Sequence, residues 1–173
     1  MAKPPQHPSD VIDALELLAD QHAELDELFE QIGSATSDKR RRFAELADKL
    51  AAHATIEEKL FYPAVMSKQT EQLLRYAVDD HLEIKRMLAE LLELEPDDAE
   101  FDEVMAELEQ AVGFHAHDHE EGRLFPIARA LLDDDQRAGL GNELLAMFDA
   151  LMAEAPREHV PDETDAPAPL PAP

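Results

Sequence analysis

The chain has 173 residues, of which 45% are hydrophobic, so its length and composition suit one domain with a core of its own. It contains no cysteine, which excludes disulfides, thiolate zinc sites and cysteine nucleophiles, and any metal must therefore be held by nitrogen and oxygen ligands. Its formal net charge of −25 opposes contact with phosphate backbones and anionic lipids, so we expect neither a nucleic-acid partner nor a membrane partner.

The residue composition favours helices over strands. Only 5 residues are glycine and aromatic side chains make up 5% of the chain, whereas alanine, leucine and glutamate are abundant. No apolar run approaches the about 20 residues that a membrane span needs, and the first ten residues lack the apolar stretch of a signal peptide. We therefore expect an all-α protein located in the cytoplasm.

The two ends of the chain are rich in proline. Residues 1–9 contain three prolines and residues 155–173 contain six. Neither segment can bury much apolar surface, so both are predicted to be disordered tails. The folded domain is then predicted to span residues 10–154.

Helix-breaking residues divide this domain into five predicted helices. Gly33, Pro63 and Pro96 end or kink the first three, and Pro126 does the same for the fourth. The predicted helices span residues 10–32, 38–62, 70–94, 99–125 and 134–153. Because the first four are long and follow one another through short connections, we predict an up-down-up-down four-helix bundle with an additional C-terminal helix.

Three of these helices carry a histidine on their apolar face. At about 100° per residue, His22 falls among the leucines of the first helix, His53 and Glu57 share the apolar face of the second, and His81 lies on that of the third. One such histidine is usually a hydrogen-bonded core residue, but three helices repeat the pattern. Because a buried carboxylate is costly unless a cation meets it, the pattern indicates a metal site suited to iron, zinc or manganese.

The apolar pattern of the fourth predicted helix changes phase partway along. Its later apolar residues rejoin the early face only if one residue is left out of the count between His115 and Glu120; they are Leu124, Ile127 and Leu131. A π-bulge produces such a slip, and π-bulges are frequent at functional sites. We therefore predict a bulge that turns His115 and Glu120 inward together.

Two other arrangements of this helix compete with the bulge. Without a slip, His119 shares the inward face with His115. His117 and Glu121 repeat the spacing of His53 and Glu57 and need no bulge, but a regular helix places them opposite its early apolar residues. We therefore expect His117 to be exposed and keep His119 as a further candidate ligand.

The chain also repeats itself. The sequence DQHAEL at residues 20–25 parallels DDHLEI at residues 79–84, and EEKLFYP at residues 57–63 parallels EEGRLFP at residues 120–126. Amphipathic hairpins resemble one another in their apolar positions, but this does not explain histidine and glutamate in matching positions. The repeat therefore favours two copies of one metal-binding hairpin, as a two-metal bundle core requires.

With these motifs, residues 10–150 resemble the hemerythrin-like family, whose members are also called HHE cation-binding domains. The resemblance implies a four-helix bundle that holds two non-haem iron ions bridged by the carboxylates of Glu57 and Glu120. It implies four terminal ligands: His22, His53, His81 and His115. Oxygen-carrying members have a second histidine four residues further along the third helix, where this chain has Lys85. His119 or water would then complete the site, which argues against simple reversible oxygen carriage.

Three functions remain in competition on the sequence alone. The leading hypothesis is a di-iron protein that binds oxygen, peroxide or nitric oxide for sensing, storage or scavenging. The second is a di-iron enzyme with peroxidase-like or catalase-like activity, and the third is a metal-free helical interaction module. The Glu-x-x-His motif of ferritin-like bundles and the His-Glu-x-x-His motif of metalloproteases are absent around the central histidines. The sequence makes no prediction of the oligomeric state.

Overall fold

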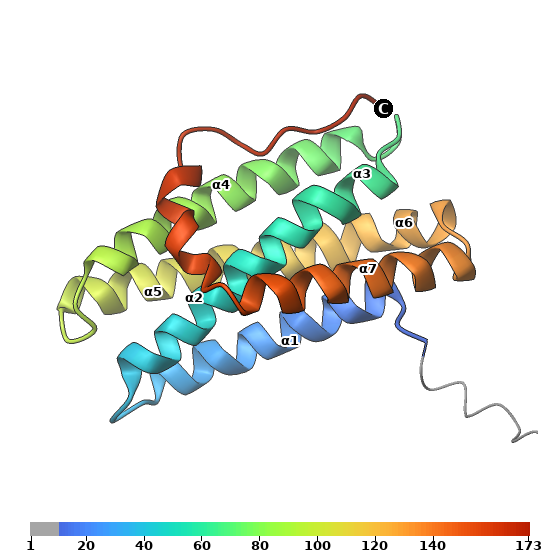
Figure 1. The fold of residues 1–173 in the computed structure, drawn as a ribbon. Coiled ribbons are helices and arrows are strands. Elements are labelled where there is room, and N and C mark those ends of the chain that lie inside the picture. Colours follow the sequence, from blue (N-terminus) through green and yellow to red (C-terminus); the bar gives the residue numbers. More distant parts are fainter. Residues whose placement is uncertain (1–10) are drawn as a thin grey trace, which may run out of the picture.

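The computed structural model describes residues 11–173, and these form helices and connecting loops without a strand (Figure 1). This confirms the predicted all-α class. The predicted tail of residues 1–9 lies outside the described residues.

The first half of the chain folds as a helical hairpin. Helix α1 spans Ala14–Gly33 and begins where the Asp13 carboxylate accepts hydrogen bonds from two free backbone amides. Helix α2 spans Lys39–Ile56 and continues without interruption through the π-helical segment η2, Glu57–Phe61, into α3, Tyr62–Val65. The α1 and α2 helices pack along each other.

The second half repeats this plan. Helix α4 spans Glu71–Glu93, and α5, Ala99–Gly113, packs against it. The α5 helix continues through a second π-helical segment, η3, Phe114–Leu124, into α6, Phe125–Leu131. Consecutive long segments run in opposite directions, and α7, Asp134–Met152, lies along α1 and α2 (Figure 1).

Each π-helical segment ends two residues before a proline. The prolines are Pro63 and Pro126, and each stands in the first turn of the short α-helix that follows. Proline has no N–H and its ring collides with the preceding turn of a regular α-helix, so a wider turn at this point lets the helix continue. The prolines therefore change the register of these helices and do not end them. The sequence predicted the second of these segments but not the first.

Two apolar clusters fill the interior. The first core includes Leu28, Phe43, Leu91 and Phe101, whose helices meet near the loops that follow α1 and α4. The second core fills the opposite end and includes Leu15, Phe61, Leu74, Phe125 and Leu144. Along each of the four long segments, the central histidine lies between the stretches that build the two cores.

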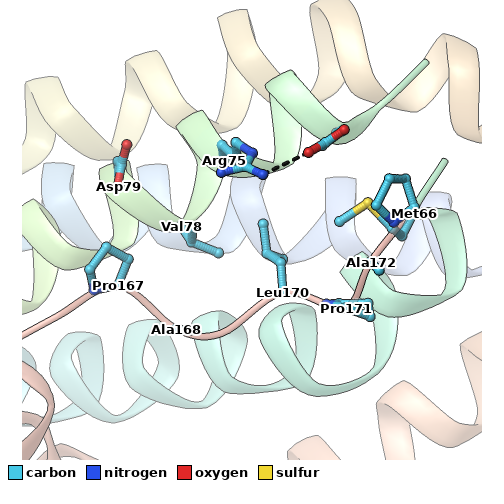
Figure 2. Close-up of a pocket in the computed structure, with 11 residues that line it drawn as sticks. Met66, Arg75, Val78, Asp79, Pro167, Ala168, Leu170, Pro171 and Ala172 are labelled. Carbon is cyan, nitrogen blue, oxygen red and sulfur yellow. Dashed lines mark hydrogen bonds and ion pairs between the residues drawn. The ribbon is translucent and has the colours of Figure 1, made fainter. Parts of the chain in front are cut away.

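The structure differs from the expectation of a disordered tail over residues 155–173. A 3₁₀ helix, η4, spans Pro156–Glu163 and packs on α2 and α4, with Val160 only 1% exposed in the first core. The last residues then run beside α4, where Leu170 packs at the edge of the second core (Figure 2). The proline content suggested disorder, but two well-placed apolar side chains attach the segment to the bundle.

Among the described helices, none combines the length and the apolar character needed to cross a membrane.

Candidate metal centre

The structure brings together six of the seven predicted site residues. They come from four different helical segments and each is at most 3% exposed: His22, His53, Glu57, His81, His115 and Glu120. Such a layer of titratable groups between two apolar cores is costly unless the groups satisfy one another or a bound ion.

The predicted bulge in the fourth long segment is confirmed. The π-helical segment η3 contains both His115 and Glu120, and both are buried. The side chains of the rival pair, His117 and Glu121, are 44% and 32% exposed, so the arrangement without a bulge is wrong. Leu131 was also expected to rejoin the inward apolar face, but it is 40% exposed, so the prediction for this residue is wrong.

Both glutamates reach toward two histidines. In Glu57, Oε1 lies 3.2 Å from Nε2 of His53, and Oε2 lies 3.2 Å from Nε2 of His81. In Glu120, Oε2 lies 3.1 Å from Nε2 of His22, and Oε1 lies 3.6 Å from Nε2 of His115. Each carboxylate therefore stands between one histidine of the first hairpin and one of the second.

The side-chain atoms form two groups that share Glu57. The first group consists of His22, His53, Glu57 and Glu120, and one ligand atom from each lies within 4.8 Å of the others. The second group joins Glu57 to His81 and His115, again within 4.8 Å. In the second group the two Nε2 atoms are 3.0 Å apart.

Unpartnered atoms test whether a cation fits the first group. Nε2 of His22, Nε2 of His53, Oε1 of Glu57 and Oε2 of Glu120 are all buried and make no hydrogen bond. Buried polar atoms without partners are rare in folded proteins because each costs about 1–3 kcal/mol. Since all four are nitrogen or carboxylate oxygen atoms that converge on one point, the donor set fits a divalent metal ion.

The electrostatics of the layer point the same way. Burial alone lowers the pKa of His22, but the nearby carboxylates of Glu120 and Glu121 outweigh it and raise this pKa to about 9. The pKa of His115 is likewise raised to about 10, against the effect of burial, by nearby carboxylates. Burial raises the pKa of Glu57, yet the surrounding histidines hold it well below its usual value. The buried carboxylates of the layer are therefore stabilised by positive charge close to them.

All four histidines point Nε2 at the centre and Nδ1 outward to a hydrogen-bond acceptor. The pairs are His22 with Glu121 at 2.7 Å, His53 with Gln21 at 2.7 Å, His81 with Glu58 at 2.9 Å and His115 with Asp80 at 3.2 Å. An acceptor at Nδ1 holds the proton there and leaves Nε2 free to bind a metal. None of these four partners was predicted from the sequence.

His119 does not join the centre. Its Nδ1 lies 2.6 Å from Oδ2 of Asp80, the same oxygen that contacts Nδ1 of His115. The π-helical turn rotates His119 away from the inward face, so the idea that it completes the ligand set is not supported by its position.

Tyr62 is a member of the centre that the sequence reasoning missed. It is fully buried, and its O–H donates a hydrogen bond to Oε1 of Glu120 at 2.8 Å. The hydroxyl oxygen of Tyr62 also lies 3.3 Å from Oε2 of Glu57. Burial and the two carboxylates raise the pKa of Tyr62 well above its usual value, so the phenol keeps its proton. Tyr62 follows Glu57 by five residues, and a one-residue slip in the second helix, such as the one predicted in the fourth, would have placed it on the inward face.

An all-helical fold with a buried histidine and carboxylate layer defines a class of protein, the helical cation-binding domains. Comparison with known proteins agrees: the chain belongs to the hemerythrin HHE cation binding domain family, whose family model matches residues 13–128.

Two individual proteins are similar to this chain. The crystal structure of a hemerythrin HHE cation binding domain-containing protein from Mycobacterium kansasii, a homologue of Rv2633c, superposes with a TM-score of 0.74 at 22% identity, covering 88% of this chain and 94% of that one. A DNA nickase of Nostoc sp. (strain PCC 7120) is 31% identical over 104 residues, which are 60% of this chain. The chain spans only 29% of the length of that relative.

Proposed function

We propose that this protein is a hemerythrin-like di-iron protein that binds oxygen, peroxide or nitric oxide for sensing, storage or scavenging. In this proposal the four long helical segments form an up-down-up-down bundle around one centre with two iron ions. A pair of iron ions supplies a redox-active site for small ligands that protein side chains alone do not provide.

The observation that carries the proposal is the position of the two glutamates. Each directs one oxygen toward the first group and the other toward the second, which is the arrangement expected of bridging carboxylates. The terminal ligands would be the four central histidines through Nε2, each held in orientation by the acceptor at its Nδ1.

The rest of the chain would exclude water and hold protons near the centre. The two apolar cores close the layer from both ends, so a small neutral ligand enters more readily than a charged one. The O–H of Tyr62 keeps a proton beside Glu120, where it can stabilise a negatively charged ligand by donating a hydrogen bond.

Elemental analysis of protein purified from iron-replete medium, combined with an optical spectrum, tests the proposal. We expect close to two irons per chain and absorption bands that change on addition of nitric oxide or azide. Protein saturated with zinc, or consistently metal-free, would contradict the di-iron assignment and would favour the interaction module.

A second candidate function, peroxide disproportionation at the same centre, is favoured by Tyr62. Its buried O–H is a hydrogen-bond donor beside Glu120, where it could stabilise the negative charge that develops on peroxide as the O–O bond breaks. If this function is correct, Tyr62→Phe should retain its metal but release oxygen from hydrogen peroxide at least about tenfold more slowly than the wild type. Equal rates would leave the binding function in place and remove the argument for the enzyme.

We propose that the protein is located in the cytoplasm and that it has neither a nucleic-acid partner nor a membrane partner. The net charge of −25 opposes binding to phosphate backbones, so the nicking of DNA named for the Nostoc relative is not extended to this chain.

A further inference from the structure

Lys85 is a buried lysine for which the proposed ligand set has no role. It lies one helical turn after His81 in α4 and is only 6% exposed. Its ammonium group points away from the centre and donates to both oxygens of Glu58, at 2.9 and 3.0 Å. A lysine buried this deeply requires a partner, and Glu58 supplies it.

Glu58 connects this lysine to a central histidine. Its Oε1 accepts a hydrogen bond from Lys85 and also lies 2.9 Å from Nδ1 of His81. The Glu58 side chain is only 8% exposed, so the carboxylate would be poorly solvated without a cation beside it. Lys85 therefore stabilises the one acceptor that orients His81.

The surroundings show what Glu58 would do without Lys85. The carboxylate borders a cavity of about 320 Å³, which Lys59, Lys85 and Glu163 also line. Without the ammonium group, we expect the carboxylate to gain solvation by turning into this cavity and leaving His81. The ring of His81 would then lose the contact that holds its proton on Nδ1 and keeps Nε2 free.

His53 provides a comparison within the same chain. Its Nδ1 lies 2.7 Å from the amide oxygen of Gln21, a neutral acceptor that is itself buried. Among the described residues, no cation forms an ion pair or hydrogen bond with Gln21. A neutral amide can therefore orient a central histidine without a cation beside it, whereas the buried carboxylate of Glu58 is paired with Lys85.

We infer that Lys85 is a positioning residue for the metal bound by His81 and His115, acting through Glu58. The inference rests on the proposed function, because it assumes that this second position binds a metal. It predicts that the two metal positions respond differently to loss of Lys85, and that a neutral residue at position 58 removes the need for the lysine.

Titration of the metal-free protein with Co²⁺, followed by visible absorption and calorimetry, tests this inference. In Lys85→Met we expect one of the two bound ions to be weakened by about 10- to 100-fold, the range typical for loss of a residue that orients a ligand, and the other to be unchanged. In the double variant Glu58→Gln with Lys85→Met we expect the weakened ion to recover to within a few-fold of wild type. Lys59→Met, which removes an exposed lysine from the same cavity, serves as the matched charge control and should bind both ions normally.

The arms of this experiment separate two kinds of failure. If the wild-type protein binds fewer than two Co²⁺ ions, the proposed function fails and the inference fails with it. If the wild type binds two and Lys85→Met binds both with unchanged affinity, only the inference is overturned. A loss of both ions together in Lys85→Met, with no recovery in the double variant, would also overturn it, because the lysine would then support the fold and not one histidine.

Discussion

At the scale of single residues, the two carboxylates of Glu57 and Glu58 show how neighbours on one helix take different tasks. Glu57 is completely buried and directs its oxygens to His53 and His81, whereas Glu58 contacts the outer nitrogen of His81 and the ammonium group of Lys85. One therefore touches both proposed metal positions and the other supports a single ligand from behind.

This difference predicts the metal content of two alanine variants. Glu57→Ala removes a proposed bridging ligand and leaves two histidines without their partner, so we expect it to lose both metals. Glu58→Ala removes only the acceptor of His81, so we expect about 10- to 100-fold weaker binding at one position. Elemental analysis after dialysis of the two purified variants measures the difference, and equal retention would show that Glu57 is not a bridge.

At the scale of helical elements, the two π-helical segments set which side chains face the centre. Segment η3 brings His115 and Glu120 to the same face although they are five residues apart, and η2 does the same for Glu57 and Tyr62. A regular α-helix would separate each pair by more than a quarter of a turn. The wider turns before Pro63 and Pro126 therefore have a direct consequence for the site.

Helix α7 offers a test of close packing between elements. A Cβ atom added at Gly141 would lie 2.1 Å from the carbonyl oxygen of Ile12, a backbone atom that cannot easily move, whereas one added at Gly139 meets nothing within 4 Å. We expect Gly141→Ala to lower the free energy of unfolding by about 1–3 kcal/mol through overpacking. Gly139→Ala, in the same helix, should raise it by about 0.5–1 kcal/mol because alanine favours helix. Urea denaturation of both variants would measure this, and similar effects at the two positions would contradict the packing.

At the scale of the whole molecule, a polar layer is held between two apolar cores. Apolar packing on both sides therefore shields the titratable groups of the layer from solvent. The C-terminal segment takes part in this arrangement, since Val160 belongs to the first core and Arg157 pairs with Asp48 of α2. The segment is therefore part of the fold and adds to its stability.

Shortening Val160 tests this role. Val160→Ala removes two buried methyl groups and should lower the free energy of unfolding by about 1–3 kcal/mol. Val11→Ala is the matched control, because Val11 is 66% exposed and its truncation should change stability by less than about 0.5 kcal/mol. Chemical denaturation compares the two, and an unchanged midpoint for Val160→Ala would mean that the segment does not unfold together with the bundle.

The sequence by itself determined the helical class and the inward positions of the six central residues. Both follow from local periodicity: apolar residues recur with the helical repeat, and the histidines and glutamates interrupt the same face. The bulge between His115 and Glu120 was also predictable, because a slip in register leaves a trace in the apolar pattern of one segment.

Only the tertiary structure decided what surrounds these residues. His22 meets Glu121 across 99 residues of sequence, and Arg157 meets Asp48 across 109. The direction of Lys85, the outward position of His119 and the attachment of the C-terminal segment depend in the same way on distant partners. Periodicity within one helix shows which face is buried, but the identity of a contact across helices is set by how the helices pack, since that alone brings the two side chains within reach of each other.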